Sequence, residues 1–270
     1  MKNILDNSIL KEFCKLCTYT TNLGWHERNG GNLSYLLYED DIKDYLDLNN
    51  VIREIPTGFS HPDLAGKYFL ITGTGKYFKN VEENPELNLG IIRIKQDGST
   101  AELLWGFSDG GKFTSETPAH LLSHVTRLKV NPKNRVVYHC HPANVMAMTF
   151  TDELTDKHFT RIIWTFNNEC IFVMPEGIGV LPWMVTGSNE IGEATAEKMK
   201  EYRVVVWANH GIYGCGETLD EAFGLVDTVE KTAKVYILCG DKKIINPITD
   251  EHLKTLVKTY NLPARMDFID

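Results

Sequence analysis

Three histidines next to apolar segments are the residues of this chain best suited to hold a metal ion. His139 and His141 flank Cys140 after the apolar run Val136–Tyr138. The composition of residues 135–141 predicts a strand, on which residues two apart point to the same face. Both imidazoles can therefore reach one cation, whereas Cys140 is expected to point away into the core.

A third ligand is needed, because catalytic zinc usually has three protein ligands and one open position. His210 follows the apolar run Val204–Trp207, which predicts another strand, and precedes Gly211, which lets the backbone turn sharply. If the two strands are neighbours, the three imidazoles converge. Imidazole suits zinc, although the same donors also suit iron, cobalt and nickel.

Two further histidines, His120 and His124, are rivals for the metal. They are four residues apart on a predicted helix that runs to about Lys129, with Glu116 one turn earlier on the same face. They could form a ligand pair, a polar face of the same pocket or a solvated face, so no role is assigned to them. Ser115 is the expected cap of this helix.

Two glutamates are candidates for proton transfer. Glu116 lies at the predicted helix start after Thr114, where free N–H groups and hydroxyls gather, although a glutamate there can also merely offset the helix macrodipole. Near a metal it could bind the cation and move away when substrate arrives. Glu169 is the second candidate and precedes a predicted strand, Ile171–Met174, but could equally be an ordinary loop acid.

Two glycine-rich loops could hold a phosphate. They are residues 29–32 and residues 72–76, and neither matches a P-loop or a dinucleotide-binding pattern. Glycines let backbone N–H groups approach an anion, and the flanking Asn, Thr and Lys side chains add donors. Together with Thr114 and Ser115, the loops have enough donors for one phosphate.

Helices and strands must position these residues, and their predicted pattern indicates one domain over residues 1–270. Asp97-Gly98 between two apolar runs predicts a β-hairpin, and the longest predicted helix spans residues 219–239. Helices and strands alternate along the chain. We therefore expect an α/β or α+β fold with one mixed or largely antiparallel sheet, covered by helices on both sides.

Composition limits the classes of function. The net charge is −8 and no basic stripe occurs, so nucleic-acid binding has no support. No segment has the length and apolar character of a membrane span, and the N-terminal residues lack the apolar core of a signal peptide. A cytoplasmic location is the simplest expectation, and in a reducing compartment the six cysteines should be free thiols.

Taken together, the motifs resemble the class II aldolase family, which includes fuculose-phosphate aldolase and ribulose-phosphate 4-epimerase. The stretches that carry the resemblance are Trp25–Leu33, Ile71–Lys76, Leu104–Gly106, Thr114–His120, His139–His141, Ile178–Val185 and His210–Gly211. The first of these and the Leu-Pro-Trp-Met segment are most typical of the rhamnulose-1-phosphate aldolases within this family. Thr74 stands where serine is expected, and the hydroxyl is retained.

The resemblance implies reversible cleavage of L-rhamnulose 1-phosphate to dihydroxyacetone phosphate and L-lactaldehyde through a metal-stabilised enediolate. It implies one zinc ion (Zn2+) per subunit, held by the three histidines, and Glu116 and Glu169 as catalytic residues. It also implies a homotetramer with active sites near the subunit interfaces. The residues implied in phosphate binding are Asn29, Asn32, Thr74, Gly75, Thr114 and Ser115.

Three alternatives use the same motifs. A related aldolase or a 4-epimerase would act on fuculose or ribulose phosphate, and a sugar-phosphate dehydratase is a further enzyme class. Metal and phosphate motifs do not separate these enzymes, whereas release of lactaldehyde does. A non-catalytic scaffold of the same fold would be expected to lack the histidines or Glu116, which are all present here.

Overall fold

The computed structural model describes residues 1–270 and contains one nine-stranded sheet. The strands are β1 (Asn32–Leu37), β2 (Arg53–Pro56), β3 (Tyr68–Thr72), β4 (Leu89–Ile94), β5 (Thr100–Gly106), β6 (Val136–Cys140), β7 (Gly179–Leu181), β8 (Val204–Trp207) and β9 (Gly211–Gly216). Their order across the sheet is β2-β5-β4-β3-β1-β6-β9-β8-β7. The pair β7–β8 is parallel and every other pair is antiparallel.

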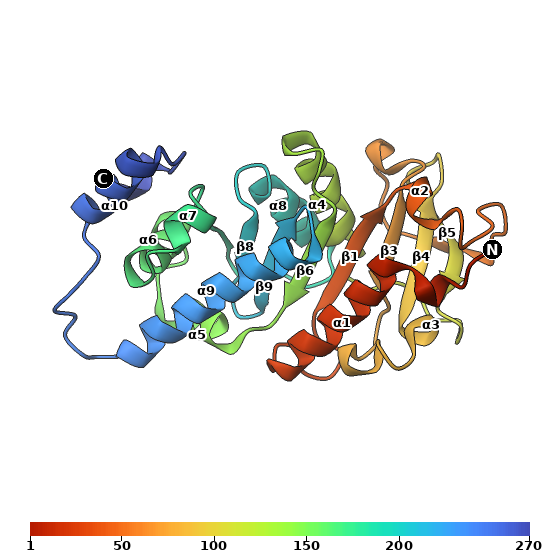
Figure 1. Cartoon of the computed structure of the whole chain (residues 1–270), viewed down its shortest axis with the longest axis horizontal. Coiled ribbons are helices and arrows are strands. Elements are labelled where there is room, and N and C mark those ends of the chain that lie inside the picture. Colours follow the sequence, from red (N-terminus) through yellow and green to blue (C-terminus); the bar gives the residue numbers. More distant parts are fainter.

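Eleven α-helices surround this sheet. They are α1 (Ser8–Asn22), α2 (Glu39–Ile42), α3 (Pro85–Asn88), α4 (Thr117–Val130), α5 (Ala143–Thr151), α6 (Asp156–Phe166), α7 (Cys170–Val173), α8 (Asn189–Lys198), α9 (Leu219–Cys239), α10 (Asp250–Tyr260) and α11 (Met266–Ile269). Helices α1 and α9 cross one face of the sheet, with α4 and α8 on the opposite face (Figure 1). The predicted α/β fold, with helices on both sides of a largely antiparallel sheet, is confirmed.

Strand β1 shows how the alternation of side chains supplies both layers. Leu33, Tyr35 and Leu37 belong to the large core beneath α1 and α9. Leu36 points the other way and packs in a second core that contains Leu121 of α4. The strand is buried on both faces because helices cover both.

Helix α1 forms where the spacing of apolar residues predicts it. The side chain of Asn7 accepts a hydrogen bond from the backbone N–H of Leu10 and so caps the first turn. Phe13, Cys14 and Cys17 are buried on the face that packs against the sheet. All six cysteines of the chain are free thiols, as expected.

Two local predictions are wrong. Ile171–Met174 is not a strand, since residues 170–173 form helix α7; an apolar run this short fits either structure. Ser115 does not cap α4, because the helix begins at Thr117 with Glu116 in the cap position. The hydroxyl of Thr114 instead accepts a hydrogen bond from the backbone N–H of Glu116.

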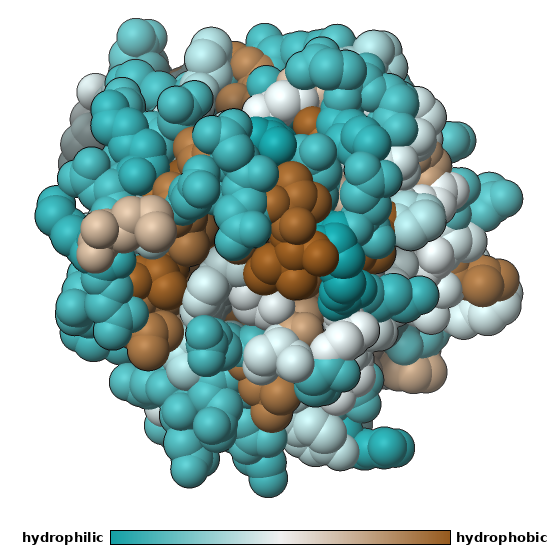
Figure 2. Space-filling model, turned by 90° about the vertical axis from the view of Figure 1, so that its right-hand side faces the viewer, coloured by the Kyte–Doolittle hydropathy of each residue, from teal (hydrophilic) through white to brown (hydrophobic).

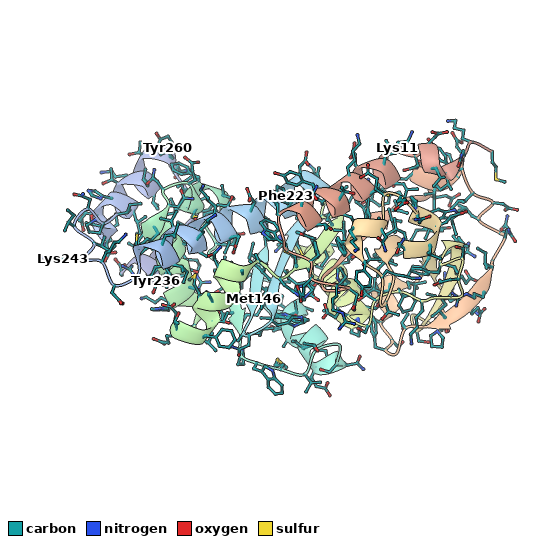
Figure 3. The ribbon with its side chains drawn as sticks, turned by 90° about the horizontal axis from the view of Figure 1, so that it is seen from below. Lys11, Met146, Phe223, Tyr236, Lys243 and Tyr260 are labelled. Carbon is teal, nitrogen blue, oxygen red and sulfur yellow. The ribbon has the colours of Figure 1, made fainter.

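The two ends of the molecule differ in character. The end with the N-terminus and the short edge strand β2 is mainly hydrophilic around a few groups of apolar side chains (Figure 2). The other end is helical: α9 runs from Phe223 past Tyr236 towards Lys243, and α10 with Tyr260 lies at the same end of the molecule (Figure 3). None of the helices combines the length and apolar character of a membrane span.

Helix α4 carries part of the site, and its packing can be tested with Leu121→Ala. Leu121 is fully buried between α4 and the sheet, so we expect the free energy of unfolding to fall by about 2–5 kcal/mol. Urea unfolding measures the change. Leu238→Ala is the matched control, because Leu238 is 66% exposed and its loss should change the free energy of unfolding by about 0.5 kcal/mol or less. Equal effects of the two substitutions would contradict the packing described here.

Candidate active site

The pairing of β6 with two neighbours places His139 between two other polar side chains. In the register of the sheet, Asn32 of β1 lies opposite His139 on one side and Tyr213 of β9 lies opposite it on the other. Side chains directly opposite each other share a face of the sheet, so all three point towards α4 and α8. Cys140 points to the other face and is buried in the large core, as predicted.

The third histidine reaches the same place from a tight turn. Ala208, Asn209 and His210 join β8 to β9, with Asn209 in the left-handed region at φ 60°. The centroid of the His210 ring lies 5.0 Å from that of His139 and 4.8 Å from that of His141. The structure thus brings together the three predicted imidazoles, with one nitrogen of each within 4.8 Å of the others.

Gly211 is required for a different reason from the one the sequence suggests. Its φ angle is not in the left-handed region. A Cβ atom at this position would instead lie 2.4 Å from the carbonyl oxygen of Cys140 and 2.8 Å from the ring of His141. Glycine therefore lets β9 approach β6 closely beside the histidines.

Hydrogen bonds fix the orientation of two of the rings. Nδ1 of His139 donates to the carbonyl oxygen of Ile212 at 3.0 Å, and Nδ1 of His141 donates to Oε1 of Glu27 at 2.6 Å. This leaves Nε2 of each neutral ring without a proton, 3.2 Å from the other. Neither nitrogen can then donate to the other, so both lone pairs face one point.

The donor set fits a metal ion. A tetrahedral zinc with Zn–N bonds of about 2.1 Å spaces its nitrogens by about 3.4 Å, close to the separation of the two Nε2 atoms. Burial lowers the pKa of His139 well below its usual range and also lowers that of His210, which keeps both rings neutral and able to bind a cation. In addition, Nδ1 of His210 is buried without a hydrogen-bond partner.

Glu116 lies beside the three histidines, with one carboxylate oxygen held and the other less constrained. Its Oε2 accepts hydrogen bonds from Nδ2 of Asn32 at 2.9 Å and from the hydroxyl of Tyr213 at 2.7 Å. The same oxygen lies 3.4 Å from Nε2 of His139, whereas Oε1 lies 3.7 Å from Nε2 of His210. Burial, followed by the nearby carboxylate, raises the pKa of Tyr213, so its hydroxyl stays a donor.

A small polar cavity of about 140 Å³ adjoins this cluster. Its lining includes every residue expected to bind phosphate, and it contains neither lysine nor arginine. Those residues are Asn29, Asn32, Thr74, Gly75, Thr114 and Ser115, accompanied by Gly30, Gly31, Gly73, Glu116 and His141. Two loops and the segment before α4 thus converge from distant parts of the sequence.

His26 supports the first glycine-rich loop, residues 29–32, through a hydrogen bond to its backbone. Nδ1 of His26 donates to the carbonyl oxygen of Gly30 at 3.0 Å, and Nε2 accepts from the hydroxyl of Tyr138 at 2.9 Å. Gly31 has φ 75°, and a Cβ there would lie 2.4 Å from the His26 ring. The sequence did not single out His26, because this contact depends on the fold around Tyr138.

A second cavity of about 310 Å³ lies on the other side of His141. It is lined by Glu27, His210 and the segment around Trp183, whose side chain is 68% exposed. His141 borders both cavities, so the polar cavity lies next to the histidine cluster. A larger hollow of about 580 Å³ between α1 and α9 contains none of the predicted site residues.

Glu169 lies elsewhere in the chain. It is exposed at the start of α7, a helix that packs against α9, and it lines neither cavity. Within one chain, the structure therefore does not bring Glu169 together with the histidines or Glu116.

His120 and His124 lie in the interior of the protein, outside the histidine cluster. Both are fully buried, which excludes the solvated face considered above. Neither belongs to the histidine cluster. Instead Nδ1 of His120 and Nε2 of His124 lie 2.7 Å and 2.9 Å from the hydroxyl oxygen of Ser34.

Comparison with known proteins agrees with this geometry. The family model described as "Class II Aldolase and Adducin N-terminal domain" matches residues 11–237. The chain belongs to the class II aldolase family, whose members are metal-dependent enzymes.

Particular relatives narrow the comparison. A protein of Listeria monocytogenes serotype 4a named rhamnulose-1-phosphate aldolase is 53% identical over 270 residues, covering 100% of this chain and 99% of that protein. One of Enterococcus faecalis with the same name is 47% identical, covering 99% of this chain and 96% of that protein. Among solved structures, a sugar-phosphate aldolase from Thermotoga maritima aligns with a TM-score of 0.75 at 28% identity, covering 86% and 94% of the two chains.

The hydrogen bond from His141 to Glu27 can be tested with Glu27→Ala. Loss of the carboxylate removes the acceptor that orients the ring, so we expect the dissociation constant for zinc to rise by about 10–100-fold. Competition with a chelating dye measures this constant. Glu153→Ala removes an exposed carboxylate outside both cavities and should leave it unchanged. Unaltered zinc affinity in Glu27→Ala would rule out an orienting role.

Buried histidines should make stability depend on pH. Burial lowers the pKa of His124 to about 3 and that of His26 to about 4, so the native protein leaves both rings neutral where the unfolded chain takes up protons. Stability is then full above about pH 6.5 and falls as the pH falls, by up to about 1.4 kcal/mol per pH unit for each ring. Urea unfolding at pH 7, 6 and 5 measures this slope.

The matched variant for this dependence is His124→Phe. Between about pH 6 and 5, this variant should take up about one proton fewer on unfolding, so its free energy of unfolding should depend less steeply on pH. This expectation holds whatever the effect of the substitution on stability at pH 7. The same slope in both proteins would mean that His124 does not stay neutral in the native state.

Proposed function

We propose that this protein is a metal-dependent aldolase that reversibly cleaves L-rhamnulose 1-phosphate to dihydroxyacetone phosphate and L-lactaldehyde. The observation that carries the proposal is a phosphate-sized polar cavity beside three converging imidazoles, with Glu116 at the boundary. The choice of substrate follows the relatives of this name, which match the chain over nearly its full length.

In this proposal His139, His141 and His210 hold the cation, and zinc is the ion that suits them. Three imidazole nitrogens, two of them on rings oriented by hydrogen bonds, would leave one position open on a four-coordinate ion. When bound, such an ion supplies a Lewis acid that stabilises the negative charge developing on the ketose oxygens.

The polar cavity binds the phosphate. Its donors are backbone N–H groups and uncharged side chains, provided by the two glycine-rich loops and by Thr114 and Ser115. Anchoring the phosphate fixes the position of the carbon chain relative to Glu116 and the histidines, which converts binding into orientation.

Glu116 moves the proton on the dihydroxyacetone phosphate half. In the cleavage direction it returns a proton to the carbon that has lost its bond to the aldehyde, and in the reverse direction it removes that proton. Oε1 is suited to this step, because Oε2 already accepts two hydrogen bonds.

The proposed catalytic role of Glu169 depends on the proposed homotetramer. Glu169 is exposed and lines neither cavity of its own chain, so it can act only at a site to which another copy brings it. A tetramer with sites near its interfaces would do so, and Glu169 would then handle the proton on the aldehyde half.

Cleavage of L-rhamnulose 1-phosphate tests the function. The purified protein should release lactaldehyde, detected by a coupled dehydrogenase; a chelator should abolish release and added zinc should restore it. We expect His139→Ala to lose its bound metal. Its activity should fall by more than the roughly 100-fold that substitution of a residue next to a metal ligand causes. His158→Ala is the control, since this partly exposed histidine lies outside the cluster.

Other outcomes separate the alternatives. Cleavage of fuculose or ribulose phosphate in place of the rhamnulose ester would replace the proposed substrate. Formation of an isomeric ketose phosphate without free aldehyde would identify an epimerase. Absence of metal from the folded protein after incubation with zinc would overturn the assignment of the three histidines.

A further inference from the structure

A line of buried polar side chains leads from Glu116 into the interior between the sheet and α4. Asn32 and Ser34 are neighbours on the same face of β1, and His120 and His124 lie one turn apart on α4. Each is in hydrogen-bond contact with the next: Glu116, Asn32, His120, Ser34 and then His124. The sequence showed the two histidines but not the serine that joins them.

The direction of every hydrogen bond in this line follows from Glu116. Nδ2 of Asn32 donates to Oε2 of Glu116 at 2.9 Å, and the hydroxyl of Tyr213 donates to the same oxygen. Oδ1 of Asn32 then faces His120, which must donate through Nε2.

The same reasoning fixes the far half of the line. A neutral His120 that donates through Nε2 has a lone pair on Nδ1, which accepts from the hydroxyl of Ser34 at 2.7 Å. The hydroxyl oxygen of Ser34 then accepts from Nε2 of His124 at 2.9 Å. All four bonds therefore point towards the carboxylate, an arrangement in which each bond polarises the next.

Burial makes this direction hard to reverse. Ser34, His120 and His124 are essentially inaccessible to solvent. A reversed amide would place Oδ1 of Asn32 against the carboxylate of Glu116, and two acceptors cannot bond to each other. It would also turn the amide nitrogen towards His120, whose buried donor would then have no acceptor, which is unfavourable.

Asn32 also belongs to the polar cavity. Its Nδ2 donates to the hydroxyl oxygen of Thr114 at 3.1 Å as well as to Glu116. One amide therefore contacts both the residues that line the phosphate cavity and the carboxylate beside the histidines, and its orientation matters to both.

We propose that His120, Ser34 and His124 are positioning residues that hold the amide of Asn32 in one orientation and thereby hold Oε2 of Glu116. This leaves Oε1 as the oxygen that exchanges a proton with the dihydroxyacetone phosphate half. The inference rests on the role proposed above for Glu116 and extends it to side chains that touch neither substrate nor metal.

The effect should fall on proton transfer more than on binding. Phosphate is held by many donors in two loops and before α4, so loss of one orienting contact leaves most of them in place. Loss of the carboxylate position removes a contact that proton transfer requires. We therefore expect a lower kcat with little change in KM.

The test follows exchange of deuterium from solvent into the reactive carbon of dihydroxyacetone phosphate, without aldehyde, alongside cleavage. In zinc-loaded protein, His120→Phe should lower both the exchange rate and kcat by about 10–100-fold, with KM within about threefold. His120→Gln should recover most of the loss, since its amide nitrogen can take the place of Nε2 as donor to Asn32.

Two further variants and a control test whether the loss of exchange becomes smaller with distance from Glu116. Ser34→Ala should reduce exchange less than His120→Phe, and His124→Phe should reduce it least, because His124 is furthest from Glu116. Ser123→Ala is the matched control: Ser123 is buried on the same helix, but its hydroxyl has no hydrogen-bond partner. Its exchange rate should equal that of the unmodified protein.

A second readout does not depend on activity. In crystals of metal-free His120→Phe, the amide of Asn32 should be reversed or in two orientations, and Glu116 should be displaced from Tyr213. Glu116 in its original position, or equal exchange in His120→Phe and the unmodified protein, would overturn the inference. So would failure of His120→Gln to recover more activity than His120→Phe.

Failure of the proposed function has a different signature. An unmodified protein that binds zinc but neither cleaves the substrate nor exchanges deuterium would refute the reaction, while the crystal structures would still test the positioning of Glu116. If His120→Phe does not fold, Ser34→Ala and His124→Phe carry the same comparison with smaller expected losses.

Discussion

The register between β1, β6 and β9 is the constraint on which the site depends. Because side chains alternate along a strand, pairing Asn32 with His139 and His139 with Tyr213 places all three on one face. The residues next to them, such as Cys140, point to the opposite face and join the main core. A single pattern of backbone hydrogen bonds therefore both builds the polar centre and covers its reverse side with apolar contacts.

The polar groups of the site are satisfied chiefly by one another. Glu116 is buried, yet Asn32 and Tyr213 both donate to it, which offsets the cost of removing a carboxylate from water. The hydrogen-bond donors that line the polar cavity are uncharged, and the carboxylate of Glu116 borders it. The phosphate site proposed above therefore needs no cluster of lysine or arginine, although the net charge of the chain is −8.

Features that depend on nearby residues could be predicted from the sequence. The opposite directions of His139 and Cys140 follow from strand periodicity, and the hairpin around Asp97-Gly98 follows from its turn residues. Features that depend on contacts between distant segments could not be predicted. Tyr213 donates to Glu116 across 97 residues of sequence, and Ser34 joins His120 only because β1 packs beneath α4.

The site depends on the number of residues in the turn between β8 and β9. Three residues separate the two strands, and His210 is the last of them. One residue added between His210 and Ile212 would exchange the faces of β9, sending the tyrosine towards α9 and the neighbouring Ile212 towards Glu116. A substitution in this segment therefore changes one side chain, whereas a shift by one residue changes the face of every side chain that follows it in β9.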